Sequence, residues 1–233
     1  MPTRTDTTVT DVPDPQVLHH ALPAIVVHTA LRREFRLAGP LVRDLVATDT
    51  HRIDIVTRHL DLLLRLLHHH HQLEDDLVWP ILRERAEEAL QPVVDQMGDQ
   101  HTEIARLADE AALLLTDLDT TAWIADRDRL ADVLGELHLH LVEHLDLEER
   151  VVLPFAERHL NAAEWDEIGR RADGATPKNE RALTFGMFQY EGDPVVLASM
   201  LEPAPRLVRV LVPRLARRAY RRRAIAVHGT PTP

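Results

Sequence analysis

The chain has 233 residues, a formal net charge of −11, few glycines (8) and only 4% aromatic residues, a balance that favours helices over strands. It contains no cysteine, which excludes thiol catalysis, disulfides, zinc–thiolate sites and iron–sulfur clusters. Any bound metal must therefore rest on nitrogen and oxygen ligands. The length allows one domain with a sizeable core and an appendage.

Charge is distributed unevenly along the chain. Residues 1–173 carry 17 Lys/Arg against 34 Asp/Glu, whereas residues 174–233 carry 10 against 4. We expect the acidic part not to bind nucleic acid. The basic part is expected to dock on the acidic part. The alternative is that it reaches for an anionic partner, nucleic acid, a lipid headgroup or a protein partner. No apolar run approaches the roughly 18 residues of a membrane span, and the N-terminus lacks the apolar stretch of a signal peptide. We therefore expect a cytoplasmic protein without a membrane span.

Apolar residues at spacings of three and four predict four long helices. The first is marked by residues 25–35, and Gly39-Pro40 is expected to break or bend it. The other three are marked by stripes over residues 53–81, 94–115 and 130–155. Histidines and glutamates interrupt these apolar stripes. Four such helices predict an all-α fold, an up-down four-helix bundle.

An internal duplication relates the two halves of this bundle. HHQLEDDLVWP at 70–80 matches HLDLEERVVLP at 144–154 in its first histidine, the glutamate four residues later and the final proline. Upstream, HTALRR at 28–33 matches HTEIAR at 101–106. Two helix pairs related by a pseudo-twofold axis would bring equivalent side chains together midway in the core. The residues that should meet are His28, His70, Glu74, His101, His144 and Glu148.

These six residues suit a pair of metal ions. Residues four apart on a helix differ by about 40° in direction, so the imidazole and carboxylate of each His-x-x-x-Glu pair project from one face. Each ion would take two histidines and an oxygen from each of two bridging glutamates. Room would remain for a bridging oxo or hydroxo group and an exogenous molecule. By ligand hardness alone, the donors suit iron, manganese or zinc.

The alternative is a bundle with a polar core network and no metal. A single His-x-x-x-Glu pair is usually a surface pair worth a few tenths of a kcal/mol. Two such pairs on apolar stripes differ, because burying their charged groups without partners would cost several kcal/mol each against a stability of about 5–15 kcal/mol. The duplication therefore favours a metal site.

The repeat does not select the remaining histidines. His71 follows the predicted ligand His70, but its repeat equivalent is Leu145, so we expect a pocket residue beside the site or a solvated side chain. His159, one turn beyond Phe155, could line the mouth of a pocket. The others are expected to be exposed or locally hydrogen-bonded: His51, His59, His68, His69, His138 and His140.

The order of the six predicted ligands, H…HxxxE…H…HxxxE, resembles that of the hemerythrin/HHE cation-binding family. The resemblance covers roughly residues 18–173 and includes EWDEIGRRA at 164–172, which looks like the closing helix of many members. It implies a four-helix bundle with two iron ions, in which the four histidines are terminal ligands and the two glutamates bridge.

The sequence departs from the pattern that this resemblance implies for oxygen-carrying members. Their second histidine on the third helix is missing, since Met97 and Ala105 flank His101. Glu149 could supply their acid five residues after the last histidine, but the repeat selects Glu148 as the bridging ligand. The symmetrical pattern is more similar to members associated with peroxide decomposition, iron or oxygen sensing, or repair of nitrosative damage to iron centres.

We therefore expect a flexible N-terminal tail (1–17), a hemerythrin-like bundle (18–173) and a proline-punctuated, basic helical extension (174–233). The leading hypothesis is a non-haem di-iron protein that decomposes peroxide or handles oxygen or nitric oxide. The alternative is an oxygen, nitric oxide or iron sensor that signals through the extension; iron-centre repair and iron storage are less favoured. The extension is expected to dock on the bundle, or to cap its open end, through Phe185, Met187, Phe188, Val195, Leu197, Met200 and Leu201.

Overall fold

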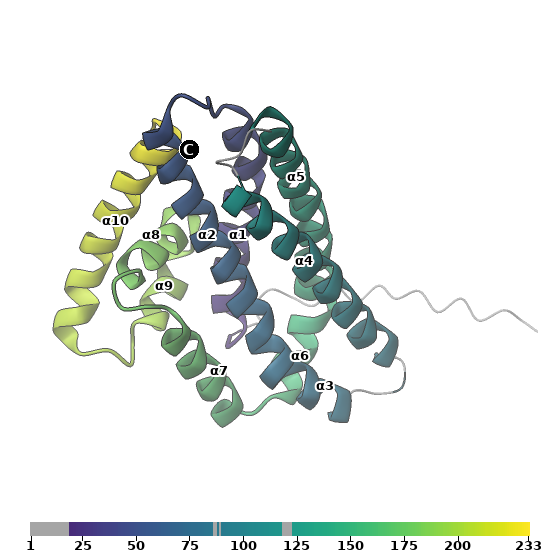
Figure 1. The fold of residues 1–233 in the computed structure, drawn as a ribbon. Coiled ribbons are helices and arrows are strands. Elements are labelled where there is room, and N and C mark those ends of the chain that lie inside the picture. The colour runs from purple at the N-terminus through teal and green to yellow at the C-terminus, as the bar shows by residue number, and fades with distance from the viewer. Residues whose placement is uncertain (1–18, 86–87, 89, 118–122) are drawn as a thin grey trace, which may run out of the picture.

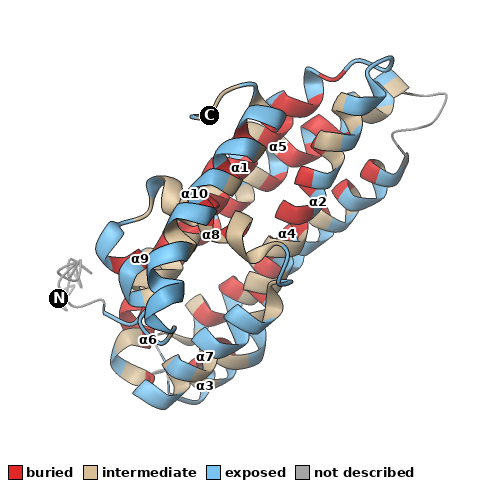
Figure 2. Cartoon of the chain, turned by 90° about the vertical axis from the view of Figure 1, so that its left-hand side faces the viewer, coloured by how far each residue is buried: buried red, intermediate tan, exposed pale blue. Residues whose placement is uncertain are grey.

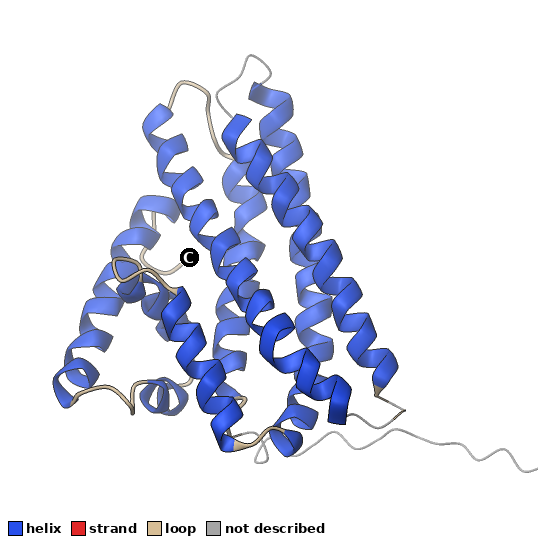
Figure 3. Cartoon of the chain, turned by 60° about the horizontal axis from the view of Figure 1, so that its bottom comes forward, coloured by secondary structure: helices blue, strands red, loops and turns tan. Residues whose placement is uncertain are grey.

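The computed structural model describes residues 19–233 apart from 86–87, 89 and 118–122, so the expected N-terminal tail lies outside the described residues. Every regular element in the described part is helical (Figure 3). In chain order the helices are α1 (Leu22–Arg43), α2 (Thr50–Leu73), α3 (Trp79–Arg85), α4 (Gln91–Asp117), α5 (Trp123–Leu147), α6 (Leu153–His159), α7 (Ala162–Ala175), α8 (Arg181–Glu191), α9 (Pro194–Met200) and α10 (Arg206–His228).

Helices α1, α2, α4 and α5 form a four-helix bundle (Figure 1). α5 packs along both α1 and α4, and α2 also contacts α1 and α4. α3 and α6 continue α2 and α5 after one turn of π-helix each. The predicted four-helix bundle with a helical extension is confirmed. No helix of the described residues combines the length and apolarity that a bilayer-spanning segment needs.

Two apolar clusters fill the bundle at different levels, and buried residues follow the inward faces of its helices (Figure 2). The larger cluster includes Phe35, Leu63 and Leu134, and the smaller includes Trp79 and Phe155. Burial of this apolar surface contributes roughly 25 cal/mol per Å² to folding. The histidines and glutamates that interrupt the stripes lie between the clusters along the chain, so the polar centre is enclosed by apolar side chains.

The first helix continues through Gly39-Pro40 to Arg43, so the expected break is wrong. Pro40 removes one i→i−4 hydrogen bond from the last turn of α1, but its carbonyl oxygen still accepts from the Asp44 N–H, so the helix continues to Arg43. Gly39 has a packing role, because a Cβ at this position would lie 3.0 Å from the carbonyl oxygen of Ala131 on α5. The glycine thus allows α1 and α5 to approach closely.

Both halves of the duplication contain the same backbone irregularity. A π-helical turn spans Glu74–Val78 and another spans Glu148–Val152. The Trp79 N–H donates to the Glu74 carbonyl oxygen, and the Leu153 N–H donates to that of Glu148. The next residue in each case is the repeated proline, which has no N–H to donate. Such turns are frequent at functional sites, and each begins at a glutamate of the repeated pattern.

The closing helix expected over residues 164–172 is α7. It begins with a capping box, in which Asn161 and Glu164 bond each other's backbone N–H groups. Glu164 also accepts hydrogen bonds from Arg85 Nη1 and Nη2, at 2.9 and 2.6 Å. These contacts tie the start of α7 to the end of α3.

The extension, α8 to α10, lies along one side of the bundle (Figure 1). α8 contacts both α1 and α10. Gly186 permits the approach of α8 and α10, because a Cβ there would overlap the carbonyl oxygen of Ala216. Of the expected docking residues, Met187 and Leu197 are buried, whereas Val195 is 77% exposed. Docking of the extension is therefore confirmed, and Val195 is wrong as a docking residue.

Two ion pairs between the extension and the bundle run opposite to the expected charge attraction, whereas the Arg181–Asp173 pair at 3.4 Å follows it. Arg65 Nη2 on α2 lies 2.9 Å from Glu180 Oε1, and Arg33 Nη1 on α1 lies 3.0 Å from Glu191 Oε2. In these pairs the bundle supplies the cation and the extension supplies the acid. Net charge therefore did not predict which groups join the two parts.

Candidate metal centre

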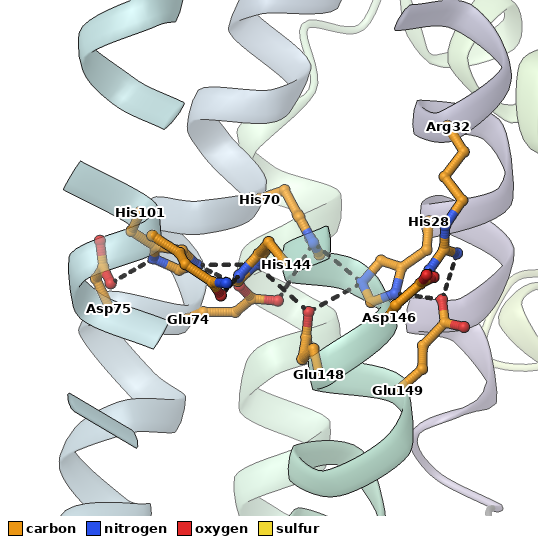
Figure 4. Close-up of polar contacts among 11 residues, drawn as sticks. His28, Arg32, His70, Glu74, Asp75, His101, His144, Asp146, Glu148 and Glu149 are labelled. Atoms are coloured by element: carbon orange, nitrogen blue, oxygen red, sulfur yellow. Dashed lines mark hydrogen bonds and ion pairs between the residues drawn. The ribbon is translucent and has the colours of Figure 1, made fainter. Parts of the chain in front are cut away.

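Six side chains predicted from the repeat meet inside the bundle (Figure 4). They come from all four helices and from the starts of both π-helical turns. Each side chain is at most 10% exposed. The six are His28 on α1, His70 on α2, His101 on α4, His144 on α5, and Glu74 and Glu148 at the two π-helical turns.

The first group of ligand-type atoms surrounds His28 and His70. Their Nε2 atoms are 3.2 Å apart. Glu74 Oε1 lies 3.3 Å from His70 Nε2, and Glu148 Oε2 lies 3.5 Å from His28 Nε2. The four atoms lie within 4.8 Å of one another, so both halves of the chain contribute to one small polar volume.

The second group surrounds His101 and His144, whose Nε2 atoms are also 3.2 Å apart. Glu74 Oε2 lies 3.4 Å from His101 Nε2, and Glu148 Oε2 lies 3.7 Å from His144 Nε2. Glu74 thus presents one carboxylate oxygen to each imidazole pair. Glu148 presents the same oxygen to both pairs.

These distances fit shared cations. Two nitrogens bound about 2.1 Å from one ion, at roughly 90–110°, are about 3.0–3.4 Å apart, as both imidazole pairs are. The Oε2 atoms of Glu74 and Glu148 are buried and have no hydrogen-bond partner. Buried oxygens of this kind are costly unless something compensates them. A cation in each group would compensate the facing nitrogens and the carboxylates together.

The pKa values of the two central glutamates are raised, which means that their charged forms lack compensating positive charge. Burial, together with repulsion from Glu74, raises the pKa of Glu148 to about 8. Burial also raises the pKa of Glu74. Burial and the neighbouring imidazoles lower the pKa of His144 to about 2. Burial also acts to lower the pKa of His101, but the nearby carboxylates of Asp75 and Glu74 outweigh it and raise that pKa to about 9. A bound cation would replace protons at the carboxylates.

Two acids hold the outer nitrogens of the histidines in a crossed arrangement. His101 Nδ1 hydrogen-bonds Asp75 Oδ1 at 2.8 Å, and His28 Nδ1 hydrogen-bonds Glu149 Oε1 at 2.9 Å. Each acid directly follows the central glutamate of one half and holds a histidine of the other half. An N–H at Nδ1 directs the lone pair of Nε2 inward and strengthens it as a ligand. Glu149 therefore lies outside the predicted ligand set, as the repeat suggested.

Further contacts support this outer layer. Arg32 Nη1 donates to Glu149 Oε1 at 2.6 Å, and Arg32 Nη2 donates to Asp146 Oδ1 at 2.7 Å. His144 Nδ1 hydrogen-bonds Gln100 Oε1 at 3.2 Å. Three of the four histidines are therefore oriented by an oxygen on the side away from the centre.

His71 is a buried member of the centre that the repeat did not select. It is 6% exposed, and its Nε2 is buried without a hydrogen-bond partner. Its ring stacks on that of His101, with centroids 4.1 Å apart, and lies 5.1 Å from that of His144. The three residues place ligand-type nitrogens within 4.8 Å of one another. The expected position beside the site is right, and a solvated His71 is wrong.

The position of His71 follows from helix geometry. Adjacent residues on an α-helix point about 100° apart, so His70 and His71 face different neighbours of α2. His70 faces His28, whereas His71 faces His101. The run of four histidines contained this signal, but a comparison of the two repeats could not show it, because the second half has Leu145 at this position.

His159 does not join the centre. Its Nδ1 hydrogen-bonds the carbonyl oxygen of Phe155 at 2.9 Å, and its ring stacks on that phenyl ring. Both contacts of His159 are with Phe155 in the same helix, α6. They do not support the expected position at the mouth of a pocket.

A second buried cluster lies where the extension meets the bundle. Glu34 Oε1 accepts hydrogen bonds from Arg33 Nη2 at 2.7 Å and from Tyr220 Oη at 3.0 Å. Glu34 Oε2 lies 3.2 Å from His59 Nε2, and His228 lies beside His59. We call these five residues the junction cluster. His59 is 2% exposed and contacts a residue of another helix, so the expected exposed or locally bonded side chain is wrong.

The fold and the centre together define a helical-bundle protein with a buried histidine–carboxylate site for cations. The hemerythrin HHE cation binding domain matches residues 26–173. The chain therefore belongs to the hemerythrin HHE cation-binding family, and α8 to α10 lie beyond the matched region. No curated protein and no solved structure matches the chain.

Proposed function

We propose that the chain holds two iron ions between its four helices. The observation that carries the proposal is the pair of 3.2 Å Nε2···Nε2 contacts beside two buried carboxylate oxygens, one each from Glu74 and Glu148, that lack hydrogen-bond partners. Manganese and zinc share the preference for these donors, so metal analysis is part of the test. The proposed ligands are His28 and His70 on one ion, His101 and His144 on the other, and Glu74 and Glu148 as bridges.

His71 extends this proposal as a third histidine at the second ion. Its partnerless Nε2 and its position against both His101 and His144 support this role. The second ion would then have five protein ligands and the first would have four. The position open to an exogenous molecule would lie at the ion held by His28 and His70.

The best-supported activity is the handling of peroxide or a diatomic ligand, with decomposition of hydrogen peroxide as its specific form. When bound, two iron ions supply redox and Lewis-acid chemistry toward such a molecule. The chain would hold the ligands by the Nδ1 hydrogen bonds and exclude water by the apolar clusters above and below them. His70 and Glu74 keep the largest exposed fractions, 10% and 8% of their side chains, and mark the side of entry.

Oxygen evolution from hydrogen peroxide by the purified, iron-loaded protein tests the proposal when it is combined with metal analysis. Glu74→Ala and His144→Ala should lose both metal and activity. His68→Ala and Glu143→Ala are matched controls, because these exposed residues lie close to the ligands in sequence. Unchanged iron content in the first two variants would remove the di-iron assignment. Two bound ions without oxygen evolution would remove the peroxide activity alone.

The second candidate function is a sensor that signals through the extension. The observation in its favour is that the junction cluster joins α10 to α1 and α2, which also carry His28 and His70. Limited proteolysis of metal-loaded and metal-free protein, with and without oxidant, tests it. A sensor should show ligand-dependent protection of residues 204–224, and identical digestion patterns would contradict sensing.

A further inference from the structure

The outer surface of α10 is strongly basic and is not neutralised by the rest of the chain. Residues 203–233 contain eight arginines and no acidic residue. Two acids of the extension, Glu180 and Glu191, already pair with arginines of the bundle. No arginine of α10 forms an ion pair with a carboxylate of the described residues, and seven of the eight are exposed. Most of the positive charge of this helix therefore faces solvent. Figure 2 shows the exposed residues of α10 in pale blue.

The same surface carries uncovered aliphatic side chains. Six of the eleven large hydrophobic residues that are exposed in the described part of the chain lie on α10. Leu207, Leu211 and Leu215 are 69%, 44% and 57% exposed. Because they are four residues apart, they share one face of the helix, while Tyr220 and Val227 pack inward. Exposed apolar groups gathered in this way indicate an interaction surface.

The inner side of the same stretch is also incompletely packed. A hollow of about 590 Å³ lies between α8, α9 and the N-terminal half of α10. Its lining includes Phe185, Leu197 and Leu201, with Arg209 and Arg217 from α10. Arg209 and Arg217 each lie two residues after one of the exposed leucines and therefore about 200° away, so this apolar hollow with guanidinium groups lies on the side of α10 opposite the leucine face.

We propose that residues 206–222 of α10 dock on an anionic phospholipid bilayer. Arginine-rich helices with one aliphatic face lie in the plane of such surfaces, where the apolar side chains enter the acyl boundary and the guanidinium groups bind phosphate oxygens. Each arginine near an anionic bilayer adds attraction. The acidic residues 1–173 are repelled by the same surface, so the protein would bind with the extension toward the lipid and the metal centre away from it.

Other occupants fit this surface less well. Nucleic acid would satisfy the arginines but would offer no apolar surface to Leu207 and its neighbours. In a second copy of the chain, parallel pairing of α10 would face arginines 214–222 with their own counterparts. Antiparallel pairing would face the leucines of 207–215 with those arginines. Of these three occupants, a bilayer offers anionic groups and an apolar layer together.

Flotation with lipid vesicles tests the proposal on the full-length, metal-loaded protein. Binding should be seen with vesicles of phosphatidylcholine mixed equally with phosphatidylglycerol and not with phosphatidylcholine alone, and it should weaken as salt is raised. Leu207→Asp with Leu211→Asp, or Arg218→Glu with Arg222→Glu, should lower partitioning at least about tenfold. Leu139→Asp and Arg170→Glu are controls, because these residues are exposed elsewhere and should leave binding unchanged.

Each alternative outcome would overturn the proposal. Equal binding to neutral vesicles would remove the role of the arginines, and no binding to anionic vesicles would remove the surface as a lipid site. Tighter binding to duplex DNA than to anionic vesicles would assign it to nucleic acid. A stable dimer that the Arg218→Glu, Arg222→Glu variant dissociates would assign it to self-association. Circular dichroism and iron content of each variant establish that the fold is intact.

Discussion

Two buried clusters of histidine and glutamate lie partly on the same two helices, and they differ in how their charge is neutralised. At the junction cluster, contacts with His59 and Arg33 outweigh burial and lower the pKa of Glu34 to about 2. At the metal centre, the ion-pair partners of Glu148 are histidines, and burial raises its pKa to about 8. Similar burial thus has opposite consequences, because His59 and Arg33 together lower the pKa of Glu34, whereas repulsion from Glu74 adds to the effect of burial at Glu148.

The difference separates a structural contact from a candidate metal site. Both clusters bring histidine and carboxylate atoms within 4.8 Å of one another. At the junction, Arg33 and Tyr220 already hold Glu34, so a cation would compete with existing partners. Glu34 Oε2 and His59 Nδ1 of the junction lack hydrogen-bond partners, as do two carboxylate oxygens and the His71 Nε2 of the centre. The junction holds one carboxylate, which Arg33 already neutralises, whereas the two carboxylates of the centre have only histidines as ion-pair partners. This difference favours the centre as the metal site.

The largest expected effect is loss of metal from variants of the centre. Glu148→Ala should lower metal affinity more than about 100-fold, because it removes an oxygen that faces both imidazole pairs. Glu34→Ala, the matched change at the other cluster, should leave metal content unchanged. Elemental analysis after dialysis measures both. Metal loss from the Glu34 variant would contradict the proposal that metal binds at the centre and not at the junction cluster.

The next largest effect is a lower free energy of unfolding when the junction cluster is altered. Glu34→Ala leaves the buried Arg33 without its main partner and should lower the free energy of unfolding by about 3–5 kcal/mol. Urea unfolding measures this loss. Glu191→Ala removes the more exposed partner of Arg33 and should cost less than about 1 kcal/mol. Equal effects of the two changes would contradict the central place of Glu34 in this cluster.

His71→Leu would make the two halves of the centre alike, because Leu145 is its repeat equivalent. It should lower the affinity for one of the two ions about 10–100-fold and leave the other ion bound. Titration with metal followed by optical spectroscopy distinguishes the two affinities. His68→Leu is the control, since His68 is exposed. Two unchanged affinities would remove His71 from the ligand set.

A smaller effect is expected from the acids that orient the histidines. Glu149→Gln and Asp75→Asn should each weaken metal binding about tenfold, because they weaken the hydrogen bonds at His28 Nδ1 and His101 Nδ1. The Glu149 change should have the larger effect, since its side chain is 26% exposed against 51% for Asp75. Asp76→Asn, which alters a surface contact with Arg171, is the control. The reverse order of the two effects would argue against this dependence on burial.

The smallest expected effect is a loss of folding stability at acidic pH, caused by His228 in the junction cluster. Burial, with repulsion from His59 and the arginines Arg52 and Arg33, lowers the pKa of His228 from 6.5 to about 4, against an opposing effect of Glu34. The unfolded chain therefore takes up this proton first, and stability should be lost as the pH falls from 6.5 towards 4. The expected loss is about 1 kcal/mol, because partial exposure of His228 screens the effect.

Urea unfolding at pH 7 and pH 5, compared between the wild type and His228→Asn, isolates this contribution from those of other titrating groups. The variant should lose less stability than the wild type between the two pH values. Glu34 should add a further loss only between its unfolded pKa of 4.5 and about 2. Parallel pH profiles for the two proteins would contradict the assignment to His228.

The sequence predicted those features that are repeated along it. The duplication predicted that His28, His70, Glu74 and their counterparts lie close together, because equivalent positions on paired helices lie at the same level of the core. It also contained the two prolines that follow the π-helical turns, although periodicity alone gave no sign of those turns.

Features that occur once in the chain were not predictable in this way. His71 breaks the symmetry of the repeat, so a comparison of its halves points away from it. The contact between Glu34 and Tyr220 joins residues 186 positions apart and leaves no local pattern. Net charge predicted attraction between the extension and the bundle, but the packing of α10 is apolar on its inner side and its arginines face outward.

The most direct test of the central claim is an anomalous-scattering map from crystals of the iron-loaded protein. We expect two iron peaks about 3.5–4 Å apart, one beside His28 and His70 and the other beside His71, His101 and His144, with Glu74 and Glu148 between them. A single peak, or iron at Glu34 and His59 in place of this centre, would contradict the account.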